Sequence, residues 1–363
     1  MFHRSVAAWV IGLCKGLRLS QSKALAELVF GAMRSRRISL ADIGRSMATD
    51  ALTKSRIKRV DRFLGNRRVR VAEGMRALVK LAAKAAGWRL VVAVDWVDVG
   101  QYKVLRAAVP LRGRSVPIMF AAYRQRQLKR SQNALEESFF VLLKEFLPKR
   151  AQVVVIADRG FARAELAWDL GVIGLPYIVR VCGKVVFESE GYSGLLRDME
   201  LYPGERLDLG WGFYRQKNPV RRRVAACWAR GHLEPWLLGT NLRWGLKRLA
   251  GAFKQRMMIE ELFRDEKNIR YGWGLRQMKL SSVERLERIF LILAFAYILL
   301  LLMGLICKQS MSAAHWSSTT SRKKPVSAFM VGRIMQNNRR FRLRELLDLL
   351  RNLLQSIAKE NWG

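Results

Sequence analysis

The sequence predicts an α/β protein built on a mixed β-sheet, with helical regions before and after it. Two changes of pattern support this. The first 72 residues read as short basic helices, but from Arg89 the chain turns to short β-branched runs bounded by glycines. After residue 245 the pattern returns to helix, first in a charged segment and then in a long apolar one.

The net charge of the chain limits the classes of molecule that it is expected to bind. The chain has 363 residues, enough for one large domain or two to three smaller ones, with 66 Lys and Arg against 29 Asp and Glu and a net charge of +37. Such an excess indicates a polyanionic partner, with nucleic acid the first candidate and an anionic membrane surface the second. The four cysteines form no CxxC pair and the three histidines are scattered, so neither a zinc site nor a disulfide framework is expected. This cysteine usage fits a reducing cytoplasm.

Residues 1–72 are predicted to form a helical DNA-binding domain. Ser39 to Asp42 reads as a capping box that opens the helix SLADIGRSMA, and a second helix, KSRIKRVDRFLGN, ends at Asn66. Clustered Arg and Lys suit contact with DNA phosphates, and the alternative is a helical lid whose cations face water. The first residues lack a small-x-small cleavage site, so we expect a helix there and not a signal peptide.

The central part is predicted to alternate strands and helices. The strands are RLVVAVDWVDV, two within KVLRAAVPLRGRSVPIMFAAY that turn at GRS, AQVVVIA and PYIVRVCG, and the helices are SQNALEESFFVLLKEFLP and ARAELAWDLG. The order of three strands, helix, strand, helix, strand indicates a mixed sheet whose leading strands are antiparallel and later strands parallel.

Residues 184–245 are rich in glycine and aromatic residues, and VRRRVAACWA and PWLLGTNL read as strands. We therefore expect a β-rich insertion in the core. The predicted organisation is a helical N-terminal domain (1–72), the first part of the core (73–183), the insertion (184–245), the rest of the core (246–308) and a basic helical C-terminal region (309–363).

Residues 289–307 carry no charge and are long enough to span a bilayer. Both flanks are basic, which gives no orientation signal, and the run continues the amphipathic helix VERLERIF. We therefore expect a buried core helix and no membrane partner, while a membrane protein with a basic cytoplasmic face stays the alternative. The polar segment SSTTSRKKP follows, and then a basic amphipathic helix, RRFRLRELLDLLRNLLQSI, suited to DNA-end contacts or dimerisation.

The stretch FKQRMMIEELFRDEK, residues 253–267, reads as one helix because it lacks Gly and Pro. Helical spacing places one carboxylate among cations on a single face, while Ile259 and Leu262 point towards a core. The residues of that face are Phe253, Arg256, Glu260, Arg264 and Lys267. This pattern suits a metal-and-phosphate site, and the alternative is a solvated face with i,i+4 ion pairs.

Two aspartates can join Glu260. Asp95 lies within the first strand and Asp158 ends the fourth, so both reach the middle of the sheet if those strands are neighbours. An acid inside VVAVDWV is costly to bury unless it is paired or bound to metal. Asp98 is a rival on the opposite strand face, and Asp158 could merely cap the next helix. The remaining rivals, Glu261 and Glu266, do not share the face of Arg256 and Lys267.

The pattern Phe253-x2-Arg256-x3-Glu260-x6-Lys267 resembles the Tyr-x2-Arg-x3-Glu-x6-Lys signature of a large group of bacterial insertion-sequence transposases with a DDE active site. RMMIEELFRDEK, ADRGF, VDRFLGN and LERIFLILAFAYILLL are also similar to segments of that group, so the resemblance covers about residues 20 to 305. One position departs, since Phe253 replaces the tyrosine. A phenyl ring can stack but cannot hydrogen-bond a phosphate, so either the hydroxyl is dispensable or this copy is impaired.

The resemblance implies an RNase H-like core with a β-strand insertion before the glutamate helix. It implies that Asp95, Asp158 and Glu260 bind two Mg²⁺ ions, with Mn²⁺ able to substitute, about 4 Å apart as in two-metal phosphoryl transfer. It implies DNA contacts by five further residues: Phe253, Arg256, Lys267, Arg159 beside the second aspartate, and Trp236, which corresponds to a tryptophan that stacks on a flipped base. For Trp236, a place in the core of the insertion is the alternative.

The expected function is a cut-and-paste DNA transposase of the bacterial cytoplasm, associated with the nucleoid. It would bind the terminal inverted repeats of its element and target DNA, as a homodimer when bound. Only metal-assisted phosphoryl transfer follows from the residue chemistry, and hairpin ends follow from the resemblance. The alternatives are an RNase H-like nuclease without strand transfer and a catalytically impaired, transposase-derived repressor.

Overall fold

A ten-stranded mixed sheet forms the centre of the protein, in a computed structural model that describes residues 2–128, 131–214, 219–311, 326–337 and 340–362. The strand order is β3-β2-β1-β4-β5-β10-β9-β8-β6-β7. The first five strands are β1 (Arg89–Val99), β2 (Tyr102–Leu111), β3 (Arg114–Arg124), β4 (Gln152–Ala157) and β5 (Tyr177–Arg180). β1, β2 and β3 are antiparallel, and β4 and β5 run parallel to β1, which confirms the predicted mixed sheet.

The register of β1 and β4 brings the middle of β1 to the end of β4. Val94 pairs with Ala157, so Asp95 and Asp158 each follow a paired residue on neighbouring parallel strands. The helices α6 (Gln125–Leu128) and α7 (Gln132–Phe146) connect β3 to β4, and η1 (Arg159–Phe161) and α8 (Ala164–Val172) connect β4 to β5. The five strands and the helices α7 and α8 lie where the sequence predicts them, within a few residues at each end, whereas the sequence analysis does not predict α6 and η1.

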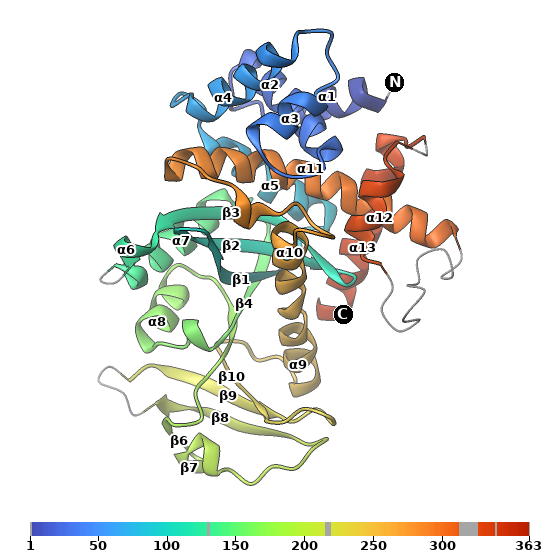
Figure 1. Cartoon of the computed structure of the whole chain (residues 1–363). Helices are drawn as coiled ribbons and strands as arrows, with labels where there is room; N and C mark the ends of the chain where they lie inside the picture. The colour runs from blue at the N-terminus through green and yellow to red at the C-terminus, as the bar shows by residue number, and fades with distance from the viewer. Residues whose placement is uncertain (1, 129–130, 215–218, 312–325, 338–339, 363) are drawn as a thin grey trace.

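The β-rich segment after β5 continues the same sheet. It contains β6 (Val186–Ser189), β7 (Tyr192–Leu195), η2 (Leu196–Asp198), β8 (Arg206–Tyr214), β9 (Arg221–Cys227) and β10 (Trp236–Thr240). β10 pairs antiparallel with β5, which joins the segment to the core strands (Figure 1). A separate small apolar cluster stabilises its outer part, where Phe187 and Tyr214 pack with ring centroids 5.5 Å apart.

The N-terminal helices lie at the opposite end of the molecule from the β-rich segment (Figure 1). They are α1 (Phe2–Leu13), α2 (Leu19–Arg34), α3 (Leu40–Ser46), α4 (Thr53–Gly65) and α5 (Val71–Ala85). The predicted cap of α3 is confirmed, since Ser39 Oγ accepts the Asp42 N–H at 3.0 Å and donates to its carboxylate at 2.7 Å. α5, for which the sequence analysis gave no prediction, packs against β3.

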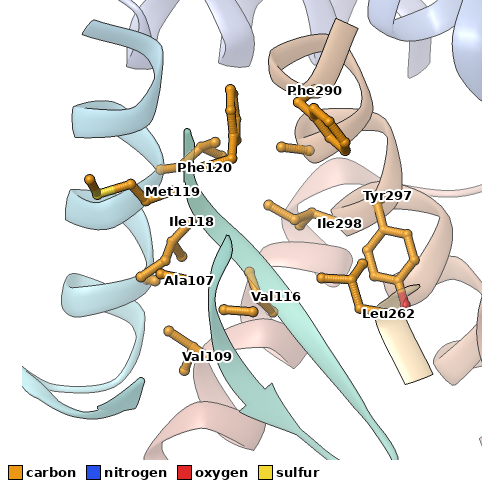
Figure 2. Close-up of a cluster of buried hydrophobic side chains, with 14 of the residues drawn as sticks. Ala107, Val109, Val116, Ile118, Met119, Phe120, Leu262, Phe290, Tyr297 and Ile298 are labelled. Atoms are coloured by element: carbon orange, nitrogen blue, oxygen red, sulfur yellow. The ribbon is translucent and has the colours of Figure 1, made fainter. Parts of the chain in front are cut away.

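The long apolar helix α11 (Val283–Ser310) is the main core helix. Within the described residues it alone is long and apolar enough to cross a membrane, but 94% of its most apolar window is buried inside the protein. It lies over β3, where Phe290 meets Phe120 with ring centroids 5.6 Å apart (Figure 2). This burial is consistent with a soluble protein.

Two C-terminal helices complete the packing, α12 (Ala328–Met335) and α13 (Leu343–Trp362). α12 crosses α11 so closely that a Cβ on Gly304 would lie 1.6 Å from the carbonyl oxygen of Ala328, so only glycine fits there. α13 returns along α5 and reaches α9 (Leu246–Lys254). The segment SSTTSRKKP lies outside the described residues.

Candidate active site

The segment 253–267 forms two helices, so the prediction of a single helix is wrong in this detail. α9 ends at Lys254 and α10 (Met257–Lys267) begins after a tight turn at Gln255 and Arg256. In the turn, Gln255 N–H donates to Ala252 O at 3.1 Å and Arg256 N–H to Phe253 O at 2.9 Å, which is the i→i−3 pattern of a 3₁₀ turn. The regular helical spacing therefore does not carry from Phe253 to Glu260.

Phe253 and Arg256 consequently face different surroundings. Phe253 is 4% exposed, with its ring 5.3 Å from that of Trp236 in an edge contact. Trp236 is half-buried between Phe253 and His232, whose ring lies 5.1 Å away. The expectation that Phe253 shares the exposed face of Arg256 is wrong, because the turn directs the phenyl ring into the core. Phe253 supports Trp236 from behind.

Arg256 connects two of the expected metal ligands. Its guanidinium donates to Asp95 Oδ2 at 3.4 Å and to Glu260 Oε1 at 2.8 Å. The side chains of Arg256, Asp95 and Glu260 are 13%, 19% and 40% exposed, so the cluster opens to solvent on the Glu260 side. The i,i+4 pair predicted on the helix face is present, and it extends to the first strand.

Asp158 lies beside Asp95 at the end of β4. Its carboxylate accepts the Gly160 N–H at 2.8 Å and caps the short helix η1, so the capping alternative describes its local role correctly. The same residue also acts on Asp95. Burial raises the pKa of Asp95 to about 6, the negative charge of Asp158 adds to the rise, and Arg256 opposes it. Glu260 raises the pKa of Asp95 further.

The donor set fits a hard divalent cation. Carboxylate oxygens are the ligands that Mg²⁺ prefers, and the charges of Asp158 and Glu260 raise the pKa of Asp95, so a cation bound there would offset their repulsion. Among the residues that the structure describes, no group of three His, Cys, Asp or Glu is close enough to hold a metal ion as it stands. Arg256 lies between Asp95 and Glu260, so binding a cation to both requires the guanidinium to move out.

The rival carboxylates on α10 have structural partners. Glu266 forms a bidentate ion pair with Arg106 of β2 at 2.9 and 3.0 Å, and the two side chains are 2% and 1% exposed. The Arg106 guanidinium also lies 4.4 Å from the Phe290 ring. Asp98, the rival to Asp95 on β1, is exposed. The pair between Glu266 and Arg106 therefore fixes α10 on the sheet.

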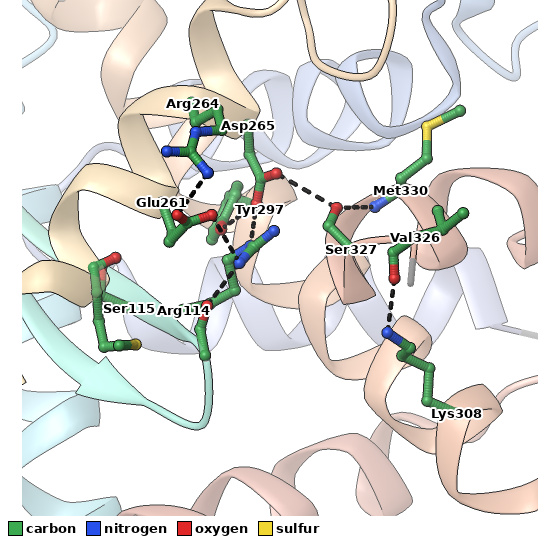
Figure 3. Close-up of polar contacts among 12 residues, drawn as sticks. Arg114, Ser115, Glu261, Arg264, Asp265, Tyr297, Lys308, Val326, Ser327 and Met330 are labelled. Atoms are coloured by element: carbon green, nitrogen blue, oxygen red, sulfur yellow. Dashed lines mark hydrogen bonds and ion pairs between the residues drawn. The ribbon is translucent and has the colours of Figure 1, made fainter. Parts of the chain in front are cut away.

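A second polar network fixes the same helix from its other side. Arg114 of the β2–β3 hairpin pairs with Glu261 at 3.0 Å and with Asp265 at 2.7 Å (Figure 3). Asp265 also accepts hydrogen bonds from Tyr297 at 2.9 Å and Ser327 at 3.3 Å, which belong to α11 and the start of α12. Glu260 is thus left on the face of α10 that these contacts do not use.

Comparison with known proteins gives no further identification. No protein-family model matches this sequence, and no curated protein matches it. The functional argument therefore depends on the geometry of the cluster and on the sequence signature.

The two other expected DNA contacts lie on opposite sides of the cluster. Lys267 ends α10, where burial and the charge of Arg276 lower its pKa while Asp98 opposes the change. Arg159 is exposed after Asp158 and pairs with Glu234 at 3.4 Å, in the loop before Trp236. The structure therefore arranges Arg159, Asp158, Asp95, Arg256 and Lys267 around one region.

The sequence analysis missed the residues that support Asp95 from behind. Glu136 of α7 is buried, accepts the indole N–H of Trp96 at 2.7 Å and pairs with Arg163. Trp96 follows Asp95, so this contact fixes the end of β1. Glu136 lacks a distinctive pattern in the sequence. Arg106 could have been found, because a charge inside an apolar strand needs a buried partner.

Proposed function

We propose that the protein is a DDE-type DNA transposase. The observation that supports this best is the cluster of three acids from distant segments. Asp95, in the middle of β1, adjoins Asp158, which follows the parallel strand β4, and Arg256 connects Asp95 to Glu260. Two-metal phosphoryl transfer needs such carboxylates on rigid elements.

The strand order supports the same proposal. The arrangement β3-β2-β1-β4-β5, with three antiparallel strands followed by two parallel ones, is consistent with the RNase H-like core that the sequence resemblance implies. The β-rich segment lies between β5 and the helices α9 and α10, where the resemblance places an insertion. The net charge of +37 suits a protein that binds long stretches of DNA phosphate.

In the proposed mechanism Asp95, Asp158 and Glu260 hold two Mg²⁺ ions, which supply activation of the attacking oxygen and stabilisation of the leaving oxygen. When Asp95 and Glu260 hold metal ions, the Arg256 guanidinium loses these two carboxylate partners. It is then free to form a bidentate contact with a DNA phosphate near the cleaved bond. The contact between Glu136 and Trp96 keeps Asp95 in place.

Three further DNA contacts complete the proposal, one from the insertion and two from the core. Trp236 is half-buried against Phe253 and is proposed to stack on an extruded base. Lys267 and Arg159 are proposed to contact phosphates on the two sides of the cluster. Joining two element ends requires a homodimer on DNA, and hairpin formation at those ends follows from the resemblance alone.

One observation favours a second candidate, a transposase-derived DNA-binding repressor. Phe253 replaces the tyrosine of the signature and is buried, so it cannot supply a hydroxyl to a phosphate. A protein of this kind would bind repeat DNA and leave it intact.

Cleavage of a duplex carrying the element's own terminal repeat tests the proposal. We expect cutting with Mg²⁺ or Mn²⁺ that Glu260→Gln and Asp95→Asn abolish. Asp98→Asn, an exposed acid on the same strand, is the matched control and should cut normally. Joining of pre-cut ends to a target plasmid separates a transposase from a nuclease. Cutting that survives Asp95→Asn contradicts the proposal, and binding without cutting by the parent favours the repressor.

A further inference from the structure

A hollow of about 390 Å³ opens beside Glu260, on the outer face of α10. The residues that line it are Glu260, Phe263, Arg264, Lys267, Asn268 and Arg276. Three of them are cationic, and Glu260 is the one acid among them. The hollow therefore starts at an expected metal ligand and leads to a positively charged wall.

Three cations and one acid line the hollow, and outside its lining Asp98, Glu266 and Asp95 favour the charge of Lys267. Arg264 is 67% exposed and pairs with Glu261 at 2.7 Å. Lys267 lies 6.0 Å from the ring of Phe263, and Arg276, from the short helix η3 (Leu275–Gln277), is close enough to disfavour its charge. Two like charges that converge on one hollow indicate an anionic ligand, because such a ligand removes their mutual repulsion.

Asn268 lines the hollow, and the loop that continues from it to Gly274 is tightly fixed. The Asn268 side chain accepts the N–H groups of Arg270 and Tyr271, each at 2.8 Å. Trp273 N–H donates to Asp265 O at 3.1 Å, and the Trp273 side chain is buried. At Gly272 a Cβ would lie 2.0 Å from the carbonyl oxygen of Asp265, so the chain turns there as glycine alone permits.

The outer side of this fixed loop displays an aromatic ring. Tyr271 is 61% exposed and Ile269 is 46% exposed, although the chain buries Trp273 only two residues further on. The loop is also anchored to the N-terminal helices, since Ile38 N–H donates to Trp273 O at 3.0 Å. An exposed ring on a rigid loop loses little conformational entropy when a base stacks on it.

We propose that the hollow and Tyr271 bind the DNA strand that leads away from the cleavage site, with a phosphate held by Lys267 and Arg276 and an unpaired base stacked on Tyr271. This inference rests on the proposed function for the origin of the strand. The dimensions agree, because the seven helical steps from Glu260 to Lys267 advance about 10 Å along α10, the axial length of about three base steps of DNA. Aromatic stacking tolerates any base, so the site recognises single-stranded character and not sequence.

The test measures DNA binding in EDTA, where no cleavage occurs. Fluorescence anisotropy compares a blunt duplex with a duplex that carries a short single-stranded extension. Tyr271→Ala should weaken binding of the extended duplex about tenfold, as expected for loss of one stacked base, and change blunt-duplex binding less than twofold. Tyr271→Phe should keep the parent affinity, and Tyr202→Ala, which alters a tyrosine of similar 66% exposure in the insertion, should have no effect.

Arg276→Gln provides the independent arm. It should weaken binding of both duplexes and lower the slope of log affinity against log salt by about 0.7 to 0.9, the value for one phosphate contact. An unchanged slope together with unchanged affinity of Tyr271→Ala overturns the inference, even if the parent cuts DNA. If both variants behave as expected and the parent does not cut, the site stands and the proposed catalytic function fails. If the parent binds neither duplex, both proposals fail.

Discussion

Replacing Asp95 with asparagine should stabilise the metal-free protein at neutral pH. Asp95 is 19% exposed, adjoins Asp158 and receives only partial compensation from Arg256. These surroundings raise its pKa from 3.8 to about 6, which means that its negative charge opposes folding. Asparagine keeps the shape of the side chain and removes the charge, so the folded state becomes more stable. The carboxylate that the proposed function needs therefore lowers the stability of the metal-free protein.

The size and the pH dependence follow from the two pKa values. Below about pH 4 the carboxyl is protonated in both the folded and unfolded states, so its charge costs nothing. Between about pH 4 and 6 the unfolded chain has lost the proton while the folded protein keeps it, and stability falls as pH rises. Above about pH 6 the penalty is complete. The rise from 3.8 to about 6, which already includes the opposing effect of Arg256, corresponds to an expected gain of about 3 kcal/mol.

Urea unfolding in EDTA at pH 7.5 and pH 4.5 measures this gain as a difference in midpoint at constant slope. Asp95→Asn should exceed the parent by the full gain at pH 7.5 and by about a third of that gain at pH 4.5. Asp98→Asn, on the exposed side of the same strand, should match the parent at both. A variant no more stable than the parent at pH 7.5, or equally stabilised at both pH values, would refute the reasoning.

Three further predictions concern the packing around the cluster. Glu266→Ala should lower the free energy of unfolding by about 3–5 kcal/mol, because it leaves Arg106 buried without its partner, and a much smaller loss in urea unfolding would contradict this. Gly304→Ala should cost about 1–3 kcal/mol by separating α11 from α12, seen as a lower Tm, and an unchanged Tm would count against the close crossing. Asn361→Ala should slow cleavage more than it weakens DNA binding. The reason is that the buried Asn361 side chain, 2% exposed, accepts a hydrogen bond from Gln255 at 3.2 Å, and Gln255 precedes Arg256. Equal cleavage rates for this variant and for the exposed control Lys359→Ala would exclude that role.

The sequence predicts the elements that carry a strong local pattern. The strand β1 matches the predicted RLVVAVDWVDV from end to end, and the Ser39 cap lies where a serine precedes an acid by three residues. The antiparallel and parallel halves of the sheet follow from the order of strands and helices. The sequence places Asp95 within the first strand and Asp158 at the end of the fourth, and the two adjoin because those strands are neighbours in the sheet.

Contacts between distant segments set the features that the sequence analysis missed. The turn at Gln255 is held by Asn361, more than one hundred residues later in the chain, so no local pattern marks it. The prediction that Phe253 shares a helical face with Arg256 is wrong for the same reason. Arg256 pairs with Glu260 at helical spacing, which is predictable, but its contact with Asp95 needs the assembled sheet. The pairing of β10 with β5 likewise depends on the folded core.

Binding of Mn²⁺ tests the central claim most directly, because it asks whether Asp95, Asp158 and Glu260 form a metal site. Electron paramagnetic resonance of free Mn²⁺, titrated with the protein bound to repeat DNA, reports the number and affinity of bound ions. We expect two ions on each active site, and affinity at least tenfold lower for Asp95→Asn and Glu260→Gln but not for Asp98→Asn. Equal Mn²⁺ binding by the parent and by Asp95→Asn would contradict the proposed site.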